Sequence, residues 1–493
     1  MRKLITAIPF AIFSLSALST IAAERIDATS GASGGSGGSG ADNFVTSVES
    51  EVYYAPLDKR ALPAERFVGF TPAHMVSRVS LIAPTQAEVK QARLDNVRYE
   101  KRGNPATDDA VPQERAQQIG LPAFIGEAAS RRLAPGALIW LPDGIGGAVA
   151  RFDVTSADAK AIRLGFSVGN MPRGATLRFV GSAENDRVFT VPGADIAAAE
   201  EGEYWSPIVL GDTISVEVQL RSFRDRGSLE LEVFGASHLF ANPAQDDNDL
   251  LKATKAGSAS CEINIVCSAD AAAKAVAAAV TRLIFTKSGS SFLCTGTLLN
   301  DTDTTTTRPY IYSANHCIST STVANTLQTF WNYQSATCGG TSSGPFTTLA
   351  GGAFLRVTDF NSDITLLEMK QAPPSGALFA GWNAGTVANN TSIVGIHHPA
   401  GDIKKISLGT MNNNNAPGFD GKTGTYYQVV WNSGVTEGGS SGSAIFTKSS
   451  TSGSYQLRGG LLGGSSFCNA QTSPDIYSRM DLKFNLLQPF LAP

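Results

Sequence analysis

The sequence predicts an all-β protein built from a β-sandwich followed by a pair of β-barrels. At 493 residues the chain is too long for a single hydrophobic core, so two or more folded units are expected. Short segments in both halves alternate apolar and polar residues with a period of two, which is the pattern of half-buried strands. The 49 glycines, together with many serines and threonines in the C-terminal half, favour tight turns between short strands.

The β-sandwich is predicted within residues 43–255, which contain no cysteine. Its strand candidates are the alternating segments 150–156, 161–168, 175–182, 213–220 and 228–235. Turn residues such as those at 170–174 separate the strands, and a helical segment from Gln86 to Arg93 precedes them. We therefore expect a sandwich that follows a more helical lead.

The pair of barrels is predicted from residue 256 to residue 493. Its strand candidates are 294–299, 363–369, 391–398, 426–431, 442–447 and 456–464. The alanine-rich segment 269–283 is expected to form one short helix. A stretch at 242–260 that is first polar and acidic, then rich in Ala, Gly and Ser, precedes the barrels and contains Lys252 and Lys255. This composition predicts a domain boundary.

The first residues predict export from the cell. Two basic residues precede an apolar stretch that runs to about Leu18, and small residues follow up to Ala23. We interpret residues 1–23 as a cleaved signal peptide and residues 24–42 as a Gly/Ser-rich linker. A membrane anchor is the alternative, but Pro9 weakens it and no second apolar segment of spanning length appears. A secreted, extracellular protein without a stable membrane anchor is expected.

Charge and cysteine usage narrow the classes of function. The net charge is −4 and no basic surplus is present, so nucleic acid is not expected as a partner. All six cysteines lie in the C-terminal half of an exported chain, which predicts three disulfides whose pairing the spacing leaves open. No CxxC pair occurs, so a metal is not expected, and no cofactor is expected either.

Three polar residues, far apart in the sequence, fit amide hydrolysis by a serine. That reaction needs a reactive hydroxyl, an imidazole that takes its proton and a buried carboxylate that orients the imidazole. Ser441 lies in a run of small residues, where the amides of Gly439 and Ser441 could form an oxyanion hole. His316 follows an apolar strand and adjoins a cysteine, and Asp363 begins another strand. Taken singly, each also fits a structural role: a loop serine, a core histidine or a capping aspartate.

Around these residues the sequence resembles the trypsin-like serine proteases. SANHC at 313–317 is similar to that family's TAAHC, SDITLLEM at 362–369 to DIALL, and GSSGSA at 439–444 to GDSGGP, in the same chain order. Over 256–493 the resemblance is closer to the bacterial lysyl endopeptidases. The shared stretches are CEINIVC (261–267), WNYQSATC (331–338), IHHP (396–399), GVTE (434–437) and the Gly463-Gly464 pair before Cys468.

The resemblance implies a chymotrypsin-type double β-barrel in which His316 is the general base, Asp363 orients it and Ser441 is the nucleophile. It implies that Asp475 binds the lysine ammonium at the bottom of the specificity pocket, with Gly463 and Gly464 beside it. The disulfides it implies are Cys261–Cys468, Cys267–Cys338 and Cys294–Cys317. Gly438, Ala444 and Leu462 depart from residues that relatives carry at these positions.

The resulting expectation is a secreted, monomeric endopeptidase that cleaves protein and peptide substrates after lysine. Residues 43–255 would be a propeptide that acts as intramolecular inhibitor or chaperone, and self-processing would cut between Lys255 and Ala256. In mammalian trypsin-like zymogens the new amino terminus pairs with an aspartate before the nucleophile, whereas Ser440 carries no charge. We therefore expect the oxyanion turn to be formed already in the precursor, with the propeptide as a steric block.

Two other functions stay open. One is a catalytically inactive barrel whose sandwich binds carbohydrate or protein, as an adhesin does, and the intact set of His316, Asp363 and Ser441 argues against it. The other is an active protease of glutamyl or broader trypsin-like specificity. His397 and His398 are interpreted as structural histidines.

Overall fold

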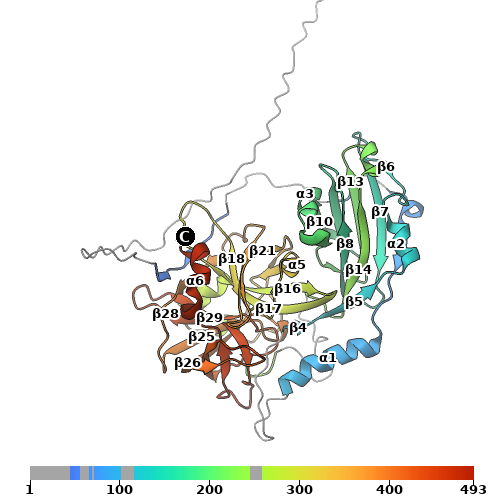
Figure 1. Ribbon diagram of the computed structural model, residues 1–493. Coiled ribbons are helices and arrows are strands. Elements are labelled where there is room, and N and C mark those ends of the chain that lie inside the picture. Colours follow the sequence, from blue (N-terminus) through green and yellow to red (C-terminus); the bar gives the residue numbers. More distant parts are fainter. Residues whose placement is uncertain (1–44, 56–65, 69–70, 102–115, 245–257) are drawn as a thin grey trace, which may run out of the picture.

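The computed structural model describes residues 45–55, 66–68, 71–101, 116–244 and 258–493 (Figure 1). Strands dominate these residues, which confirms the predicted all-β class. None of the helices among them is long and apolar enough to span a membrane. The predicted signal peptide, the 24–42 linker and the Lys255–Ala256 bond lie outside the described residues.

The first unit is a sandwich of two sheets. One sheet has the strand order β10-β9-β13-β7-β3 with β6 beside β7, and the other has the order β11-β8-β14-β5 with β12 beside β8. The strands of the first sheet are β3 (Ser77–Ser80), β6 (Leu141–Pro142), β7 (Ala148–Thr155), β9 (Thr176–Gly181), β10 (Glu184–Pro192) and β13 (Thr213–Leu220). Those of the second are β5 (Gly120–Phe124), β8 (Ala161–Val168), β11 (Glu203–Trp205), β12 (Val209–Leu210) and β14 (Leu231–Leu239). Phe152, Phe166 and Phe179 meet in the apolar core that the two sheets share.

The helical lead of the sandwich is longer than predicted. Helix α1 spans Gln86–Lys101, and Thr85 and Glu88 cap its first turn, because the Thr85 amide donates to Glu88 Oε2 at 2.7 Å. Two shorter helices, α2 (Glu127–Leu133) and α3 (Gly193–Ala197), lie against the sandwich sheets. β14 begins at Leu231 instead of residue 228, because Ser228 closes a preceding 3-10 turn.

The second unit contains the two barrel-type sheets. Six strands close a barrel, because β29 pairs with both β28 and β30 in the order β29-β28-β25-β26-β27-β30. They are β25 (Ser392–His397), β26 (Lys405–Pro417), β27 (Thr425–Ser433), β28 (Ala444–Lys448), β29 (Tyr455–Gly464) and β30 (Asp475–Tyr477), with β15 (Ile263–Asn264) beside β26. The other sheet has the order β20-β19-β16-β17-β18-β22-β21. Its strands are β16 (Val280–Lys287), β17 (Ser290–Leu299), β18 (Tyr310–Ser313), β19 (Gln328–Trp331), β20 (Thr347–Leu349), β21 (Ala353–Asp359) and β22 (Ile364–Met369).

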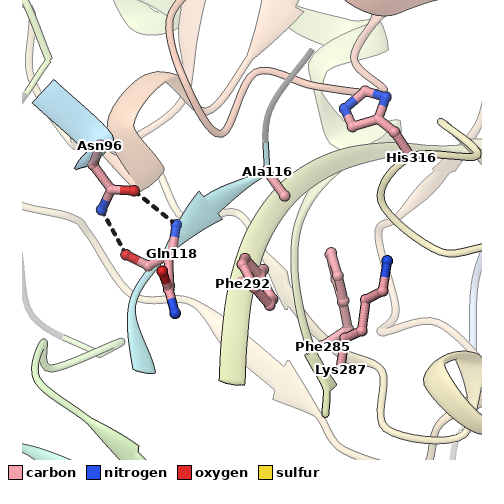
Figure 2. Close-up of a pocket in the computed structure, with 7 residues that line it drawn as sticks. All are labelled: Asn96, Ala116, Gln118, Phe285, Lys287, Phe292 and His316. Atoms are coloured by element: carbon pink, nitrogen blue, oxygen red, sulfur yellow. Dashed lines mark hydrogen bonds between the residues drawn. The ribbon is translucent and has the colours of Figure 1, made fainter. Parts of the chain in front are cut away.

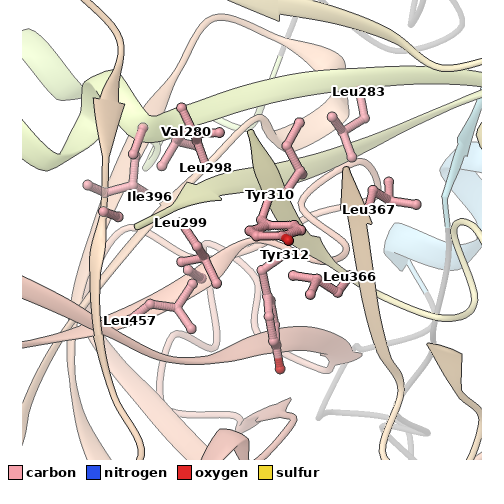
Figure 3. Packing of buried hydrophobic residues seen from close by; sticks show 14 of the residues in the cluster. Val280, Leu283, Leu298, Leu299, Tyr310, Tyr312, Leu366, Leu367, Ile396 and Leu457 are labelled. Carbon is pink, nitrogen blue, oxygen red and sulfur yellow. The ribbon is translucent and has the colours of Figure 1, made fainter. Parts of the chain in front are cut away.

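One apolar core joins the two barrel-type sheets. Leucines of β16, β17 and β22 pack toward Ile396 and Leu457 of the closed barrel (Figure 3). Helix α6 (Met480–Leu491) adds Leu487 and Leu491 to this core, and the short helix α5 (Ser321–Ala324) adds Ala324. The sheets therefore share a single buried interior, and their facing ends carry the site described below.

The predicted helix at 269–283 is partly wrong. Helix α4 covers only Ala271–Val276, a 3-10 turn follows it, and residues from Val280 onward belong to β16. Asp270 caps the start of α4 through its Oδ1, which accepts from the Ala272 amide at 2.9 Å. Val280 and Thr281 are β-branched and pair with β17. This sheet pairing ends the helix that the alanine content predicted.

Two segments of the 43–255 region pair with strands of the second unit. Near the amino terminus, β1 (Ser47–Val48) pairs with β24 (Gly381–Asn383), and β2 (Glu51–Val52) pairs with β23 (Leu378–Phe379). We call residues 45–55 the arm. Near helix α1, β4 (Gln117–Gln118) adds an antiparallel strand to β17. Both additions place residues of the 43–255 region in contact with sheets of the second unit.

A separate apolar cluster joins the sandwich to the second unit. Its buried members come from α1, β4–β5 and β14 on one side and from β16, β17 and β19 on the other, and include Val89, Ile119, Leu239, Ile284 and Leu293. Polar contacts add to it, because buried Arg163 donates to Thr326 O at 2.9 Å. The interface is thus a packed core rather than a loose surface contact.

Candidate active site

His316 and Asp363 are held together by two hydrogen bonds. His316 lies just after β18, and its Nδ1 is 2.8 Å from Asp363 Oδ2. The His316 amide donates to the other oxygen, Oδ1, at 2.9 Å. Since the carboxylate can only accept, Nδ1 carries the proton and Nε2 presents its lone pair. Nε2 is buried and makes no hydrogen bond with the residues that the structure describes.

Asp363 adopts a backbone conformation that few aspartates adopt. Its φ is +54° and its side chain is fully buried, directly before β22. A third partner, which the sequence did not reveal, is Lys422, whose Nζ lies 3.4 Å from Asp363 Oδ1. Lys422 is itself buried, and its ammonium sits 4.1 Å from the centre of the Phe360 ring. No local motif identifies Lys422, because it comes from the β26–β27 connection and meets Asp363 only through the fold.

Ser441 lies in a turn that packs against the strand end carrying His316. Gly439 and Gly442, on either side of it, have φ values of +88° and +78°, which glycine tolerates without strain. A Cβ at Gly442 would come within 2.9 Å of the Ala314 amide, two residues before His316. Thr295 of β17 holds the turn through its own amide, which donates to Ser441 O at 2.9 Å, and through its hydroxyl, which donates to Gly439 O at 2.9 Å.

The structure contains the three disulfides that the resemblance implied, Cys261–Cys468, Cys267–Cys338 and Cys294–Cys317. The last of these joins β17 to the residue after His316. Among the described residues, one group of metal-ligand types comes together, Cys294, His316 and Cys317. Both of its sulfurs are consumed by the disulfide, so this group offers no thiolate for a metal.

Asp475 lies at the start of β30 and is completely buried. Its Oδ2 accepts hydrogen bonds from Trp431 Nε1 at 2.6 Å, Ser466 Oγ at 2.7 Å and Thr436 Oγ1 at 2.8 Å. Burial raises the pKa of Asp475, while these donors act in the opposite direction. Among the described residues, no lysine or arginine forms a salt bridge with it.

Gly463 and Gly464 lie on β29, next to the strand that carries Asp475. Gly464 pairs with Asp475 across β29 and β30, and a Cβ at Gly464 would collide with the carboxylate. Gly463 pairs with the next residue of β30. Thr436, which binds Asp475, also begins the segment that leads to Ser441. The candidate specificity group and the candidate nucleophile are therefore coupled through one short segment.

The positions that depart from the resemblance have structural partners. A Cβ at Gly438 would lie 2.6 Å from Gln117 Oε1 of β4. Ala444 is the first residue of β28 and is buried. Leu462 is buried in a small apolar cluster that also contains Tyr426 and Ile476. These contacts account for a small residue at 444 and an apolar one at 462.

A cavity of about 320 Å³ opens beside His316, and residues of the 43–255 region form one of its walls. Figure 2 shows Ala116 and Gln118 next to Phe292 of β17, with His316 across the cavity. Asn96 of helix α1 fixes this wall, because its Nδ2 donates to Gln118 O at 2.7 Å and its Oδ1 accepts from the Gln118 amide at 3.2 Å. No motif in the sequence predicted this arrangement.

Comparisons with known proteins match both units. The family model described as lysyl endopeptidase N-terminal domain matches residues 90–240, and the one described as lysyl endopeptidase C-terminal domain matches residues 256–478. A lysyl endopeptidase of Pseudomonas aeruginosa (strain PAO1) is 37% identical over 412 residues, which cover 79% of this chain and 86% of that protein.

Solved structures show more distant similarity. The MamO protease domain from Magnetospirillum magneticum is 13% identical, with a TM-score of 0.30, over 43% of this chain and 96% of that chain. The HtrA-type protease AlgW with a tripeptide is 16% identical, with a TM-score of 0.32, over 45% of this chain and 62% of that chain. Similarity at this level does not bear on the ligands or substrates of the present chain.

Proposed function

The chain belongs to the lysyl endopeptidase family and is a serine endopeptidase, and from this membership we propose that it is exported and cleaves peptide bonds on the carboxyl side of lysine. The observation that carries the lysine proposal is the buried Asp475 carboxylate, which has hydrogen-bond donors but no cationic partner among the described residues. An ammonium that enters beside it compensates a charge that burial otherwise disfavours.

In the proposed mechanism, Ser441 Oγ attacks the substrate carbonyl carbon while its proton passes to His316 Nε2. The amides of Gly439 and Ser441 receive the developing oxyanion. The protonated His316 then gives its proton to the leaving amine nitrogen, the C–N bond breaks and an acyl-enzyme remains. Water repeats the sequence and releases the acid. The Nδ1–Asp363 hydrogen bond supports this proposal, because it fixes the tautomer in which Nε2 can accept.

A cleavage-site profile on a mixed peptide pool tests the proposed specificity. We expect cleavage after lysine to exceed cleavage after every other residue. A profile dominated by glutamate, or one with arginine and lysine cut equally, would replace the proposal by glutamyl or broad trypsin-like specificity. Labelling of Ser441 by a fluorophosphonate, blocked in Ser441→Ala, tests the nucleophile and separates the enzyme from an inactive binding protein.

We further propose that residues 43–255 are a propeptide that blocks the site until processing. The contact that supports this is β4, which adds to β17 as an extended substrate would and leaves Ala116 at the cavity beside His316. A Cβ at Gly438 would collide with Gln117 Oε1, so the Gln117 side chain lies beside the residue that precedes Gly439. The apolar cluster shared with the sandwich supports an additional role as a folding partner, since Ile284 of β16 and Leu293 of β17 are buried in it.

Processing is proposed at the Lys255–Ala256 bond, by the enzyme itself. The chain just after this bond is already anchored, because Ser258 Oγ donates to Asp402 Oδ2 at 2.6 Å and the Ala259 amide donates to Glu437 Oε1 at 2.8 Å. The processed enzyme is proposed to act as a monomer in the extracellular space. N-terminal sequencing of the secreted product tests the cut: Ala256 is expected, Ala253 would indicate Lys252, and any other start would indicate another protease.

A further inference from the structure

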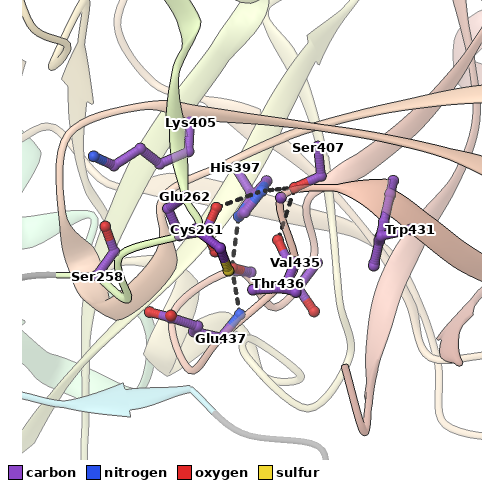
Figure 4. Close-up of polar contacts among 12 residues, drawn as sticks. Ser258, Cys261, Glu262, His397, Lys405, Ser407, Trp431, Val435, Thr436 and Glu437 are labelled. Carbon is purple, nitrogen blue, oxygen red and sulfur yellow. Dashed lines mark hydrogen bonds and ion pairs between the residues drawn. The ribbon is translucent and has the colours of Figure 1, made fainter. Parts of the chain in front are cut away.

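The residue before the proposed nucleophile is held by a buried histidine. Ser440 is completely buried, and its Oγ lies 2.8 Å from Nδ1 of His397, at the end of β25. The same oxygen accepts a hydrogen bond from the Glu437 amide at 3.2 Å. Ser440 thus connects the turn that carries Ser441 to the interior of the closed barrel. Figure 4 shows His397 between the Glu437 segment and Ser407.

The partners fix the direction of each hydrogen bond in this chain. Ser407 Oγ donates to Val435 O at 2.8 Å, so at its 3.0 Å contact with His397 Nε2 it accepts. The proton of His397 therefore sits on Nε2, and Nδ1 accepts from the Ser440 hydroxyl. Burial lowers the pKa of His397 to about 3, which agrees with a neutral ring that can accept at Nδ1.

The turn needs such an anchor because its backbone must hold two amides at one point. Gly439 and Gly442 are in the left-handed region. The Thr295 hydroxyl donates to Gly439 O, the Thr295 amide donates to Ser441 O, and the Ala400 amide donates to Gly438 O. Within the described residues, the hydroxyl of Ser440 is held by no charged group. The hydroxyl of Ser440 is thus held by neutral hydrogen bonds, one of them to a histidine inside the closed barrel.

We propose that His397 is a positioning residue for the hydrolytic reaction: through Ser440 it holds the oxyanion turn in its active conformation, independently of the amino terminus. The inference rests on the proposed roles of Ser441 and of the Gly439 and Ser441 amides. His397 does not touch the reacting atoms, so it acts on the transition state only by fixing where those amides point.

A neighbouring carboxyl group supplies a matched control. The Glu262 side chain is buried, and its Oε2 lies 3.9 Å from His397 Nε2, beyond hydrogen-bond distance. Neither Glu262 oxygen has a hydrogen-bond partner among the described residues. Glu262→Gln therefore alters the same buried neighbourhood and leaves the Ser440–His397 bond in place.

The test compares His397→Leu, His397→Asn and Ser440→Ala with Glu262→Gln and wild type. All precursors are processed by immobilised wild-type enzyme, so that weak variants are also obtained in processed form. Two ligands separate the states: a peptide aldehyde ending in lysinal forms an oxyanion, whereas n-butylamine carries only the ammonium. We expect His397→Leu and Ser440→Ala to lower kcat and aldehyde affinity about 10- to 100-fold. Butylamine affinity and KM should stay within about twofold.

His397→Asn can present an amide oxygen near the position of Nδ1, so it should recover most of the loss seen in His397→Leu. Adding one residue to the amino terminus of the processed wild type should change neither value. Equal weakening of aldehyde and butylamine, or no loss in Ser440→Ala, would overturn the inference, as would a large loss on extending the amino terminus. Wild type that fails to react with a fluorophosphonate would instead overturn the proposed function.

Discussion

Lys422 Nζ lies 3.4 Å from Asp363 Oδ1, so the carboxylate that holds His316 also faces a buried ammonium. The pair is completely shielded from solvent, and Lys422 Nζ makes a further hydrogen bond to Phe360 O at 3.3 Å. Removing one partner of such a buried ion pair is strongly destabilising, because the other partner is left as an uncompensated buried charge. The first two predictions concern Lys422 and Ser441.

Lys422→Met should destabilise the processed enzyme by about 3–5 kcal/mol, because Asp363 then stays buried without its cation. The orientation of His316 depends on that carboxylate, so kcat should fall by at least about tenfold, with KM little changed. Denaturant unfolding and steady-state kinetics on the same preparation measure both effects. Lys422→Arg, which keeps a cation, is the control and should lie closer to wild type. A Met variant within about 1 kcal/mol of wild type would contradict a structural role for the pair.

Ser441→Ala should abolish hydrolysis and self-processing, while secretion and the three disulfides persist in a heterologous host. Loss of a triad member costs several orders of magnitude in kcat. Ser443→Ala, on the same turn, should keep activity within a few-fold because its hydroxyl lies outside the proposed chemistry. The measurement is hydrolysis of a lysine ester together with gel analysis of precursor size. Residual activity of the Ala variant within about tenfold of wild type would exclude Ser441 as the nucleophile.

Asp475→Asn should remove the preference for lysine over a neutral side chain of the same length. The lost charge-assisted contact corresponds to about 1.5–3 kcal/mol, or roughly tenfold to over a hundredfold in kcat/KM discrimination. Paired substrates that differ only at the lysine position measure it. Asp270→Asn, at the cap of α4, is the matched change away from the site. If discrimination survives in Asp475→Asn, the selective carboxylate lies elsewhere.

Glu262→Gln should change how stability depends on pH. Burial raises the pKa of Glu262 well above its usual value, so the folded protein keeps a proton that the unfolded chain loses above about pH 4.5. Stability of the wild type therefore falls as pH rises through this window, by about 1.4 kcal/mol per pH unit for this group. The variant has no such proton. The free energy of unfolding of Glu262→Gln minus that of wild type should therefore increase between pH 5 and pH 8. A constant difference over that range would show that Glu262 is ionised in the folded protein.

Separately expressed 43–255 should inhibit the processed enzyme, since the sandwich has an apolar core of its own. Asn96→Ala should weaken that inhibition about tenfold or more, because it removes both hydrogen bonds between the Asn96 side chain of α1 and the Gln118 backbone of β4. Gln91→Ala changes an exposed side chain of the same helix and should have no effect. Inhibition constants with a lysine ester report the difference. Equal potency of the two variants would mean that β4 does not form the block.

The sequence pattern predicted several strands, but not those elements that depend on contacts with distant parts of the chain. β13 coincides with the predicted segment 213–220, because alternation along one strand reflects burial on one face. β8 coincides with the predicted segment 161–168, although its first six residues are all buried. β4 could not be foreseen: two glutamines have no alternation, and their strand character comes entirely from pairing with β17. The alanine content predicted a helix that continues to residue 283, but pairing with β17 places the residues from Val280 onward in β16.

The candidate site divides in the same way. His316, Asp363, Ser441 and Asp475 could be proposed from the sequence because each lies in a short stretch that resembles a known family. Lys422 and Glu262 were not, since neither has a motif and each acquires meaning only from a neighbour brought in by the fold. The interpretation of His397 as a structural histidine described its burial but not its contact with Ser440.

The arm at residues 45–55 gives the 43–255 region a second contact surface on the other unit. Its strands pair with β24 and β23, whereas the sandwich and β4 hold β16 and β17. A single cut after Lys255 would leave both contact surfaces intact, so the 43–255 region would become a bivalent ligand of the other unit. When one contact opens, the other would keep the two parts at a high effective concentration. The cleaved complex would therefore separate far more slowly than either contact alone would allow. Under the proposed processing, a further cut between the arm and the sandwich would separate the two contacts, and the lifetime of the cleaved complex would set the delay before activity appears.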